Sequence, residues 1–392
     1  MHAKQIVQRF IQSELSSMHA ARREPLAQAV SAVMRGHALS LSRVAQGTIG
    51  QGSLKSALKR VDRQIGCART REESQVLCAA IVRQVSATVG VLVIALDWSA
   101  VAPGGAFAEL RAVITGVGMG RGITLYQEVY AQAQQGSCAA EWSLLERLQA
   151  CVPAGRQVVI VTDAGFRQPW FARVQALGWQ WIGRLRGGME LATEAGRWMK
   201  LKTMFTQASG RAKRFTQCRL TRQHAWPCEL VMVRPRKTGR KIYARPGHGA
   251  TPKAQREGRA AAAEPWVLAH SSGLNRYRAE QIVAWYGLRM QIEENFRDTK
   301  STQFGMALEM SRSRSAGRLQ GLLLIHTLAA FVLWHIGQLA EAEGMHRRFK
   351  ATTRHAREIS IIRLALLLCA QGRIPLSDHA RASLFERLGF RS

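Results

Sequence analysis

Two apolar runs in the middle of the chain constrain its fold more than any other feature. The first, VLVIALDWS, spans 91–99, and the second, QVVIVTDAGF, spans 157–166; each ends near an aspartate, Asp97 or Asp163. Runs of this length that are rich in valine and isoleucine are typical of strands buried inside a sheet. An aspartate after a strand is often a turn former or a helix N-cap. Two aspartates at matching places favour a shared site instead.

The residues around these runs alternate between strand and helix patterns. Further strands are predicted at 108–116, 122–131 and 179–186, and helices at 139–150 and 170–178. This order is typical of an α/β block with a mixed sheet. After residue 187, alternating stretches at 214–222 and 228–234 predict antiparallel strands, and hence a β-rich insertion.

Helical spacing of apolar residues marks both ends of the chain. Residues 1–88 are predicted to be helical, with breaks near 23–25 and 47–52. Later helices are predicted at 279–300, 314–342, 352–370 and 379–389. The most apolar stretch, 322–334, is too short to span a bilayer and is interpreted as a buried helix.

The charge of the chain indicates a polyanionic partner. The formal net charge is +30, a large excess for a compact fold without such a partner. It is unevenly spread, because residues 91–186 carry only +2 whereas residues 187–265 carry +12. That pattern fits a cation-holding core between phosphate-holding surfaces. Histones, ribosomal proteins and membrane-surface proteins are also basic, so charge alone indicates only a class of ligand.

Two basic segments are the candidate nucleic-acid contacts. On the amphipathic helix predicted at 53–66, Leu54, Leu58, Val61 and Ile65 share one side, and the candidate contacts on the other are Lys55, Lys59, Arg60 and Arg63. In the stretch 234–259, the candidates are Arg236, Lys237, Arg240 and Lys241. The alternatives are a solvated helix face and a solvated linker.

The seven cysteines are scattered and form no CxxC pair, so neither a disulfide framework nor a zinc site is indicated. The N-terminus lacks the pattern of a signal peptide. The expected compartment is the cytosol.

The predicted helix at 279–300 carries the most informative polar residues. At about 100° per residue, Tyr286, Arg289, Glu293 and Lys300 fall within an arc of roughly 60°. The adjacent stripe is apolar, whereas Glu294 faces elsewhere, which favours Glu293 as the acid of a site. The alternative is an exposed helix face stabilised by an Arg289–Glu293 ion pair.

The spacing Tyr286-x2-Arg289-x3-Glu293-x6-Lys300 resembles the Y-(2)-R-(3)-E-(6)-K signature of IS4-family DDE transposases. Asp97 and Asp163 precede it in the order of that family, and the β-rich insertion is another of its features. The resemblance implies a ribonuclease-H-like catalytic core with this insertion, flanked by helical domains. The implied division is a helical DNA-binding domain at 1–88, the first part of the core at 89–186, the insertion at 187–265, the end of the core at 266–312 and a C-terminal helical region at 313–392.

The resemblance also implies the chemistry. Two Mg²⁺ ions, or Mn²⁺, would activate the nucleophile and stabilise the leaving 3′-oxygen during phosphodiester cleavage and transfer. Asp97 would bridge the ions, and Asp163 and Glu293 would take one each. Tyr286, Arg289 and Lys300 would grip phosphates next to the scissile bond.

Trp266 would stack on a flipped base near the transposon end; the alternative is a core tryptophan at a strand start. The implied partners are double-stranded DNA, as terminal inverted repeats and target, and a second copy in a synaptic dimer. A cytoplasmic, nucleoid-associated prokaryotic protein is expected. Two other functions remain open: a non-catalytic DNA-binding regulator on the same fold, and a structure-selective nuclease.

Overall fold

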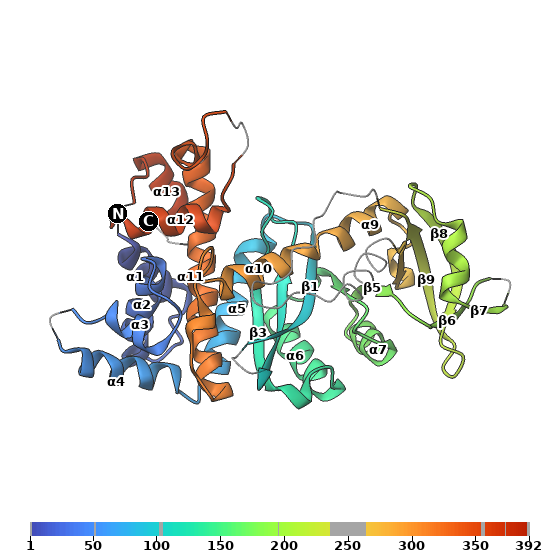
Figure 1. Cartoon of the computed structure of the whole chain (residues 1–392), viewed down its shortest axis with the longest axis horizontal. Coiled ribbons are helices and arrows are strands. Elements are labelled where there is room, and N and C mark those ends of the chain that lie inside the picture. The colour runs from blue at the N-terminus through green and yellow to red at the C-terminus, as the bar shows by residue number, and fades with distance from the viewer. Residues whose placement is uncertain are drawn as a thin grey trace, which may run out of the picture. The chain divides into compact units, whose positions relative to one another are not determined.

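The computed structural model describes residues 2–50, 52–101, 105–194, 196–235, 264–353, 357–372 and 374–389. The chain forms two compact units, one of Met1–Val158 with Arg289–Ser392 and the other of Val159–Leu288. Each unit combines strands with helices (Figure 1), which confirms the predicted α/β class. The candidates Arg236, Lys237, Arg240 and Lys241 lie outside the described residues.

The first unit contains three antiparallel strands, β1 (Val91–Ala100), β2 (Phe107–Ile114) and β3 (Ile123–Ala131), in the order β3-β2-β1. Asp97 on β1 stands opposite Arg111 on β2 in the strand register. Strand β1 continues three residues past Asp97. The sequence predicts this aspartate at the end of the strand, whereas it lies inside the strand. The reason is that residues 98–100 keep pairing with β2.

Helices surround these strands in the first unit. They are α1 (Ala3–Glu14), α2 (Ala20–Met34), α3 (Leu41–Gln46), α4 (Leu54–Ile65), α5 (Thr70–Ser86) and α6 (Cys138–Cys151), with a 3₁₀ turn η2 (Gln132–Gln134). The predicted break at 23–25 is wrong, because α2 continues through Pro25. Proline removes one helical hydrogen bond, but an almost continuous buried run from Leu26 to Met34 holds the helix in the core.

Helix α4 buries Val61 and Ile65 of the predicted apolar side but not its first residue, Leu54. Its buried residues are Ala57, Val61, Gln64 and Ile65, whereas Leu54 is 41% exposed. Leu54 is the first helical residue, directly after the N-cap Ser53. The core contact therefore begins one turn further along the helix.

The C-terminal part of the first unit is built around one long helix. Its elements are α10 (Met290–Lys300), η5 (Leu308–Met310), α11 (Ala316–Ala342), η6 (Met345–Phe349), α12 (Ile361–Ala370) and α13 (Asp378–Arg387). Helix α11 packs against β3, α2, α5 and α12. By length and composition it could cross a membrane, but 94% of its most apolar window is buried within the protein. The predicted buried helix is confirmed.

Helix α12 begins at Ile361, so the helix predicted at 352–370 is too long at its start. The hydroxyl of Ser360 accepts a hydrogen bond from the backbone N–H of Arg363 and caps the helix. Serine at this position satisfies a backbone donor that would otherwise lack a partner.

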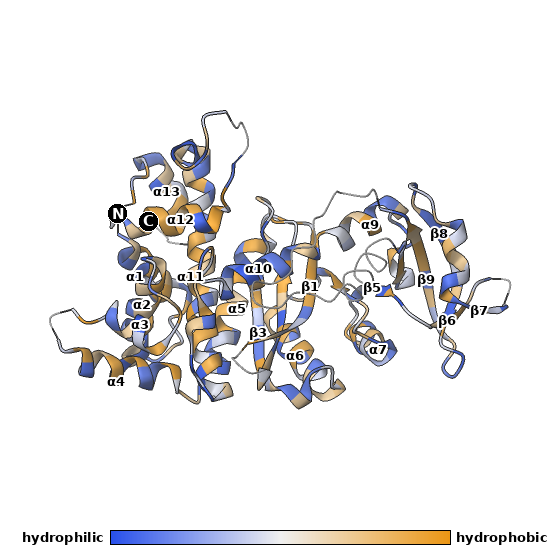
Figure 2. Cartoon of the chain, in the orientation of Figure 1, coloured by the Kyte–Doolittle hydropathy of each residue, from blue (hydrophilic) through white to orange (hydrophobic). Residues whose placement is uncertain are grey.

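The second unit holds the remaining strands in the order β4-β5-β10-β9-β8-β6-β7. They are β4 (Gln157–Thr162, whose first residues belong to the first unit), β5 (Gln180–Leu185), β6 (Glu190–Ala192), β7 (Trp198–Lys200), β8 (Lys213–Leu220), β9 (Trp226–Val233) and β10 (Trp266–His270). Strands β4 and β5 pair in parallel, whereas β8–β9–β10 is antiparallel, which confirms the antiparallel strands predicted at 214–222 and 228–234. Figure 2 shows β9 as largely apolar, in agreement with its buried residues.

The second unit also contains α7 (Gln168–Ala176), η3 (Leu201–Gln207), η4 (Ser272–Leu274) and α9 (Ala279–Gly287). The single helix predicted at 279–300 is wrong, because α9 ends at Gly287 and α10 begins at Met290. Glycine is a poor helix former, and the boundary between the two units follows Leu288. Tyr286 therefore belongs to a different helix and unit from Arg289, Glu293 and Lys300.

Candidate active site

One face of β1 and β2 carries both apolar and charged residues toward α10. Side chains alternate along a strand, so Ala95 and Asp97 share a face of β1, and Val113 and Arg111 share the corresponding face of β2. Ala95 and Val113 form a buried cluster with Ile292 and Phe296 of α10. This apolar contact fixes α10 beside the polar positions of both strands.

Asp97 and Glu293 are joined through Arg289. The Arg289 guanidinium donates from Nη1 to Oδ2 of Asp97 at 3.0 Å and from Nη2 to Oε1 of Glu293 at 2.9 Å. The side chain of Arg289 is 13% exposed, compared with 20% for Asp97 and 42% for Glu293. The structure therefore brings together Asp97 and Glu293, the first and third acids that the sequence predicts, around the guanidinium of Arg289.

The donor chemistry of this pair suits a divalent metal. Carboxylate oxygens are the ligands that Mg²⁺ prefers in proteins, and both acids already share a positive group here. Oδ1 of Asp97 accepts the backbone N–H of Trp98 at 2.8 Å, which orients the carboxylate. Within the described ranges, no group of three or more His, Cys, Asp and Glu side chains is placed to hold a metal ion.

Lys300 lies at the C-terminal end of α10 and contacts the strands. Its ammonium donates to the hydroxyl of Ser99 at 2.5 Å and to the carbonyl of Ala100, and lies 3.8 Å from Oε1 of Glu109. It also lies 5.0 Å from the ring centroid of Phe296. The side chain is 18% exposed, so Lys300 ties α10 to β1.

A buried charge network, which no sequence motif indicated, joins β2 to α10. Arg111 and Glu109 on β2 have no exposed side-chain surface, and they pair at 2.8 Å. Arg111 Nη1 also donates to Oδ1 of Asn295 at 2.5 Å and to the hydroxyl of Thr299 at 2.8 Å. Burial lowers the pKa of Arg111, and the Glu109 carboxylate opposes that effect. The available signal was two opposite charges, at alternate positions, within an otherwise apolar strand.

Asp163 belongs to the second unit and directly follows β4. Its Oδ1 accepts the backbone N–H of Gly165 at 2.7 Å, and it is half-buried. A side chain at position 165 would start 3.1 Å from that oxygen, so Gly165 leaves room for this turn. As predicted, the aspartate stands at the end of a buried strand.

Tyr286 and Trp266 also belong to the second unit. Their rings pack edge to face with centroids 5.0 Å apart, and Tyr286 is 4% exposed. Burial lowers the pKa of Arg184, an effect that the nearby Tyr286 hydroxyl opposes. Tyr286 is therefore a buried residue, and Trp266 packs against it from the start of β10.

The basic residues of α4 divide into two kinds. Lys55, Lys59 and Arg63 are exposed. Arg60 is half-buried, and its Nη2 donates to the carbonyl of Thr48 at 2.7 Å, which ties α4 to the preceding turn.

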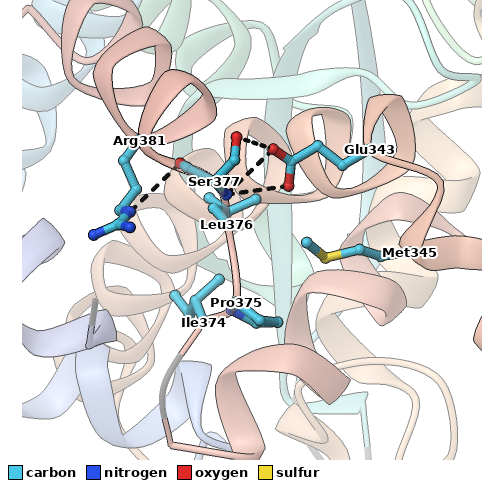
Figure 3. A pocket seen from close by; sticks show the side chains of 7 residues that line it. All are labelled: Glu343, Met345, Ile374, Pro375, Leu376, Ser377 and Arg381. Atoms are coloured by element: carbon cyan, nitrogen blue, oxygen red, sulfur yellow. Dashed lines mark hydrogen bonds between the residues drawn. The ribbon is translucent and has the colours of Figure 1, made fainter.

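A pocket of about 710 Å³ lies near the C-terminus and contains none of the candidate site residues in its lining. Figure 3 shows the Glu343 carboxylate accepting hydrogen bonds from Ser377, whose backbone N–H lies 3.2 Å away. Ser377 also caps α13. Among the described residues that line this pocket, Glu343 is the one acid, and its hydrogen bonds to Ser377 join the end of α11 to the start of α13.

A strongly basic α/β protein in which two carboxylates share one guanidinium fits the class of enzymes that process nucleic acids. The family model described as transposase DDE domain matches residues 98–332, which is more than half of the chain. The chain belongs to this family, and its class of enzyme is that of DDE transposases, which act on DNA. The match begins directly after Asp97. No curated protein matches the chain.

Proposed function

We propose that this transposase cuts the DNA ends of its element and joins them to target DNA by two-metal phosphodiester hydrolysis and transesterification. The observation that carries the proposal is the sharing of Arg289 by Asp97 and Glu293. Two acids from segments far apart in the chain meet around one guanidinium, which supports a carboxylate site. The IS4-type signature and a ribonuclease-H-like core are part of the same proposal.

Asp97, Glu293 and Asp163 would hold the metal ions. When bound, Mg²⁺ or Mn²⁺ lowers the pKa of the attacking water and stabilises charge on the leaving oxygen. Asp97 is oriented for this role by the N–H of Trp98. The guanidinium of Arg289 offsets part of the negative charge of the two acids, and it can donate to a phosphate oxygen in a planar, forked geometry.

Lys300 is proposed to contact a phosphate next to the scissile bond. It holds the carbonyl of Ala100 and the hydroxyl of Ser99 at the end of β1, so a phosphate there would compete for the same ammonium. Tyr286 and Trp266 are proposed to act at the same DNA from the second unit, where their ring contact orients both.

The surrounding DNA contacts remain proposals of the same kind. Lys55, Lys59 and Arg63 are exposed on α4 and suit phosphate binding, whereas Arg60 would act through the loop that it holds. Arg236, Lys237, Arg240 and Lys241 are proposed to bind DNA from the insertion. We propose that the protein works as a synaptic dimer on terminal inverted repeats in a prokaryotic cytoplasm.

The test is cleavage of a labelled duplex carrying the element's own ends, with and without Mg²⁺. The wild type is compared with Asp163→Asn and with Asp378→Asn, which changes an exposed acid on α13. We expect metal-dependent nicks and joined products from the wild type and Asp378→Asn, and none from Asp163→Asn. Binding without any metal-dependent product would support a regulator instead, and cuts without joined products would support a nuclease.

A further inference from the structure

A second basic feature lies in the first unit, outside the acids and α4. An open groove of about 850 Å³ is lined by two segments that are far apart in the sequence. Its basic and hydroxyl side chains are Ser40, Ser42, Arg43, Arg312, Ser313 and Arg314. We call this feature the arginine groove.

The charge of the arginine groove calls for an anion. Arg312 and Arg314 are exposed, and within the part of the chain that the structure describes neither forms an ion pair. Arg43 is also exposed and donates to the neutral amide of Gln46 at 3.1 Å. Among the described residues of the lining, Glu309 is the single acid. Three arginines against one carboxylate leave an uncompensated positive field.

The backbone that carries Arg312 and Arg314 is held in place. The N–H of Met306 donates to the carbonyl of Asp298 at 2.8 Å, and the N–H of Leu39 donates to the carbonyl of Met306 at 2.8 Å. A Cβ at Gly305 would lie 2.3 Å from the Asp298 carbonyl, so this turn requires glycine. These contacts tie the segment that leads to Arg312 and Arg314 to the end of α10 and to the α2–α3 connection. Less conformational entropy of this backbone is therefore lost when a ligand binds.

The shape and lining favour a polymer over a small molecule. Small-molecule sites are mostly apolar and enclosed, whereas this groove is open and lined by guanidinium and hydroxyl groups. Arginine and serine are frequent donors to DNA phosphates. Met310, which is 44% exposed in the lining, offers an apolar surface for a sugar.

We propose that the arginine groove binds the phosphate backbone of double-stranded DNA, without reading its sequence. This inference rests on the proposed function, because DNA is the partner in both. All of the groove residues belong to the first unit, so a duplex held there is anchored in the same unit as Asp97, Glu293 and Lys300. The alternation SRSRS at 311–315 was the signal in the sequence.

The test measures binding of the full-length chain to a labelled duplex of arbitrary sequence across about 50–200 mM salt. The variant is Arg312→Gln with Arg314→Gln. The matched control is Arg347→Gln with Arg348→Gln, which removes two exposed charges from η6. In a plot of log affinity against log salt concentration, each lost phosphate contact makes the negative slope shallower by about 0.9. At 0.1 M salt this corresponds to roughly an eightfold loss of affinity.

We expect the slope of the groove variant to be shallower than that of the wild type by about 1.8. The control should keep the wild-type slope, and both variants should keep the wild-type melting temperature. Equal slopes for the groove variant and the control, with wild-type binding intact, would overturn the arginine groove and leave the proposed function standing. No DNA binding by the wild type would overturn both. The same variant is also tested on a duplex RNA. If it lost affinity for the RNA duplex but not for the DNA duplex, the assignment to DNA would be overturned as well.

Discussion

The guanidinium of Arg289 lies 3.0 Å from the carboxylate of Asp97, although the two residues are 192 positions apart in the chain. Arg289 precedes the first residue of α10, and Asp97 lies within β1. The apolar contact of Ile292 and Phe296 with the strands makes this meeting possible. The charged pair therefore depends on a core that contains no catalytic group.

Glu293→Gln is expected to lower cleavage at least about a thousandfold, as for other residues on which the chemistry depends. The amide keeps the size of the side chain but loses the charge that a metal needs. DNA affinity should persist. The control is Glu294→Gln, which alters the ion pairs with Arg121 and Arg297 and should keep cleavage. A loss of DNA binding in Glu293→Gln would mean that this acid is structural.

Lys300→Ala is expected to weaken DNA binding or cleavage without changing sequence preference. A phosphate contact carries no base information, and its loss should lower the salt slope by about 1. Binding to a panel of duplexes measures both effects. The comparison is Lys4→Ala, whose ammonium pairs with Glu24 on α2. A shifted ranking of the duplexes would count against the phosphate role.

Arg111→Met is expected to destabilise the first unit by about 3–5 kcal/mol. The change leaves the buried Glu109 carboxylate without its closest partner, which is the costly way to break a buried pair. The double variant with Glu109→Gln should recover most of that loss, because no buried acid remains unpaired. Urea unfolding of both variants gives the free energies of unfolding. A single variant as stable as the wild type would show that the pair does not hold the fold.

Asp298→Asn is expected to change how stability depends on pH. Burial raises the pKa of Asp298 to about 6, although Arg121 opposes the shift. A raised pKa stabilises the fold below the unfolded-state value near 3.8, and that stability is lost as pH rises through 6. The variant should therefore gain roughly 2–3 kcal/mol relative to the wild type between pH 4 and pH 7. Urea unfolding at several pH values measures the difference, and a difference independent of pH would refute the shifted pKa.

Most strands and helices could be predicted because they follow local periodicity. Strand β9 and helix α6 differ from their predicted bounds by no more than two residues at either end. The errors lie where packing overrides local preference. Helix α2 passes through Pro25 because its buried side compensates for the missing hydrogen bond. Leu54 stays exposed because the core contact starts further along α4.

The candidate site divides in the same way. The spacing of Arg289 and Glu293 placed them one helical turn apart, and their ion pair follows from that spacing. The division of 279–300 into α9 and α10 separated Tyr286 from them, which no periodicity predicted. The polar partners of Arg111 on α10 were equally out of reach, because they lie 184 and 188 positions away.

The sequence by itself determined the α/β class, the identity of the candidate acids and the basic charge that indicates DNA. These properties depend on composition and short-range spacing, which a single chain displays directly. Only the tertiary structure decided that Asp97 and Glu293 share Arg289, that Lys300 holds the end of β1, and that Arg43 meets Arg312 and Arg314 in one groove. The physical reason is that such contacts depend on which buried faces pack together, and packing joins residues that no local pattern relates.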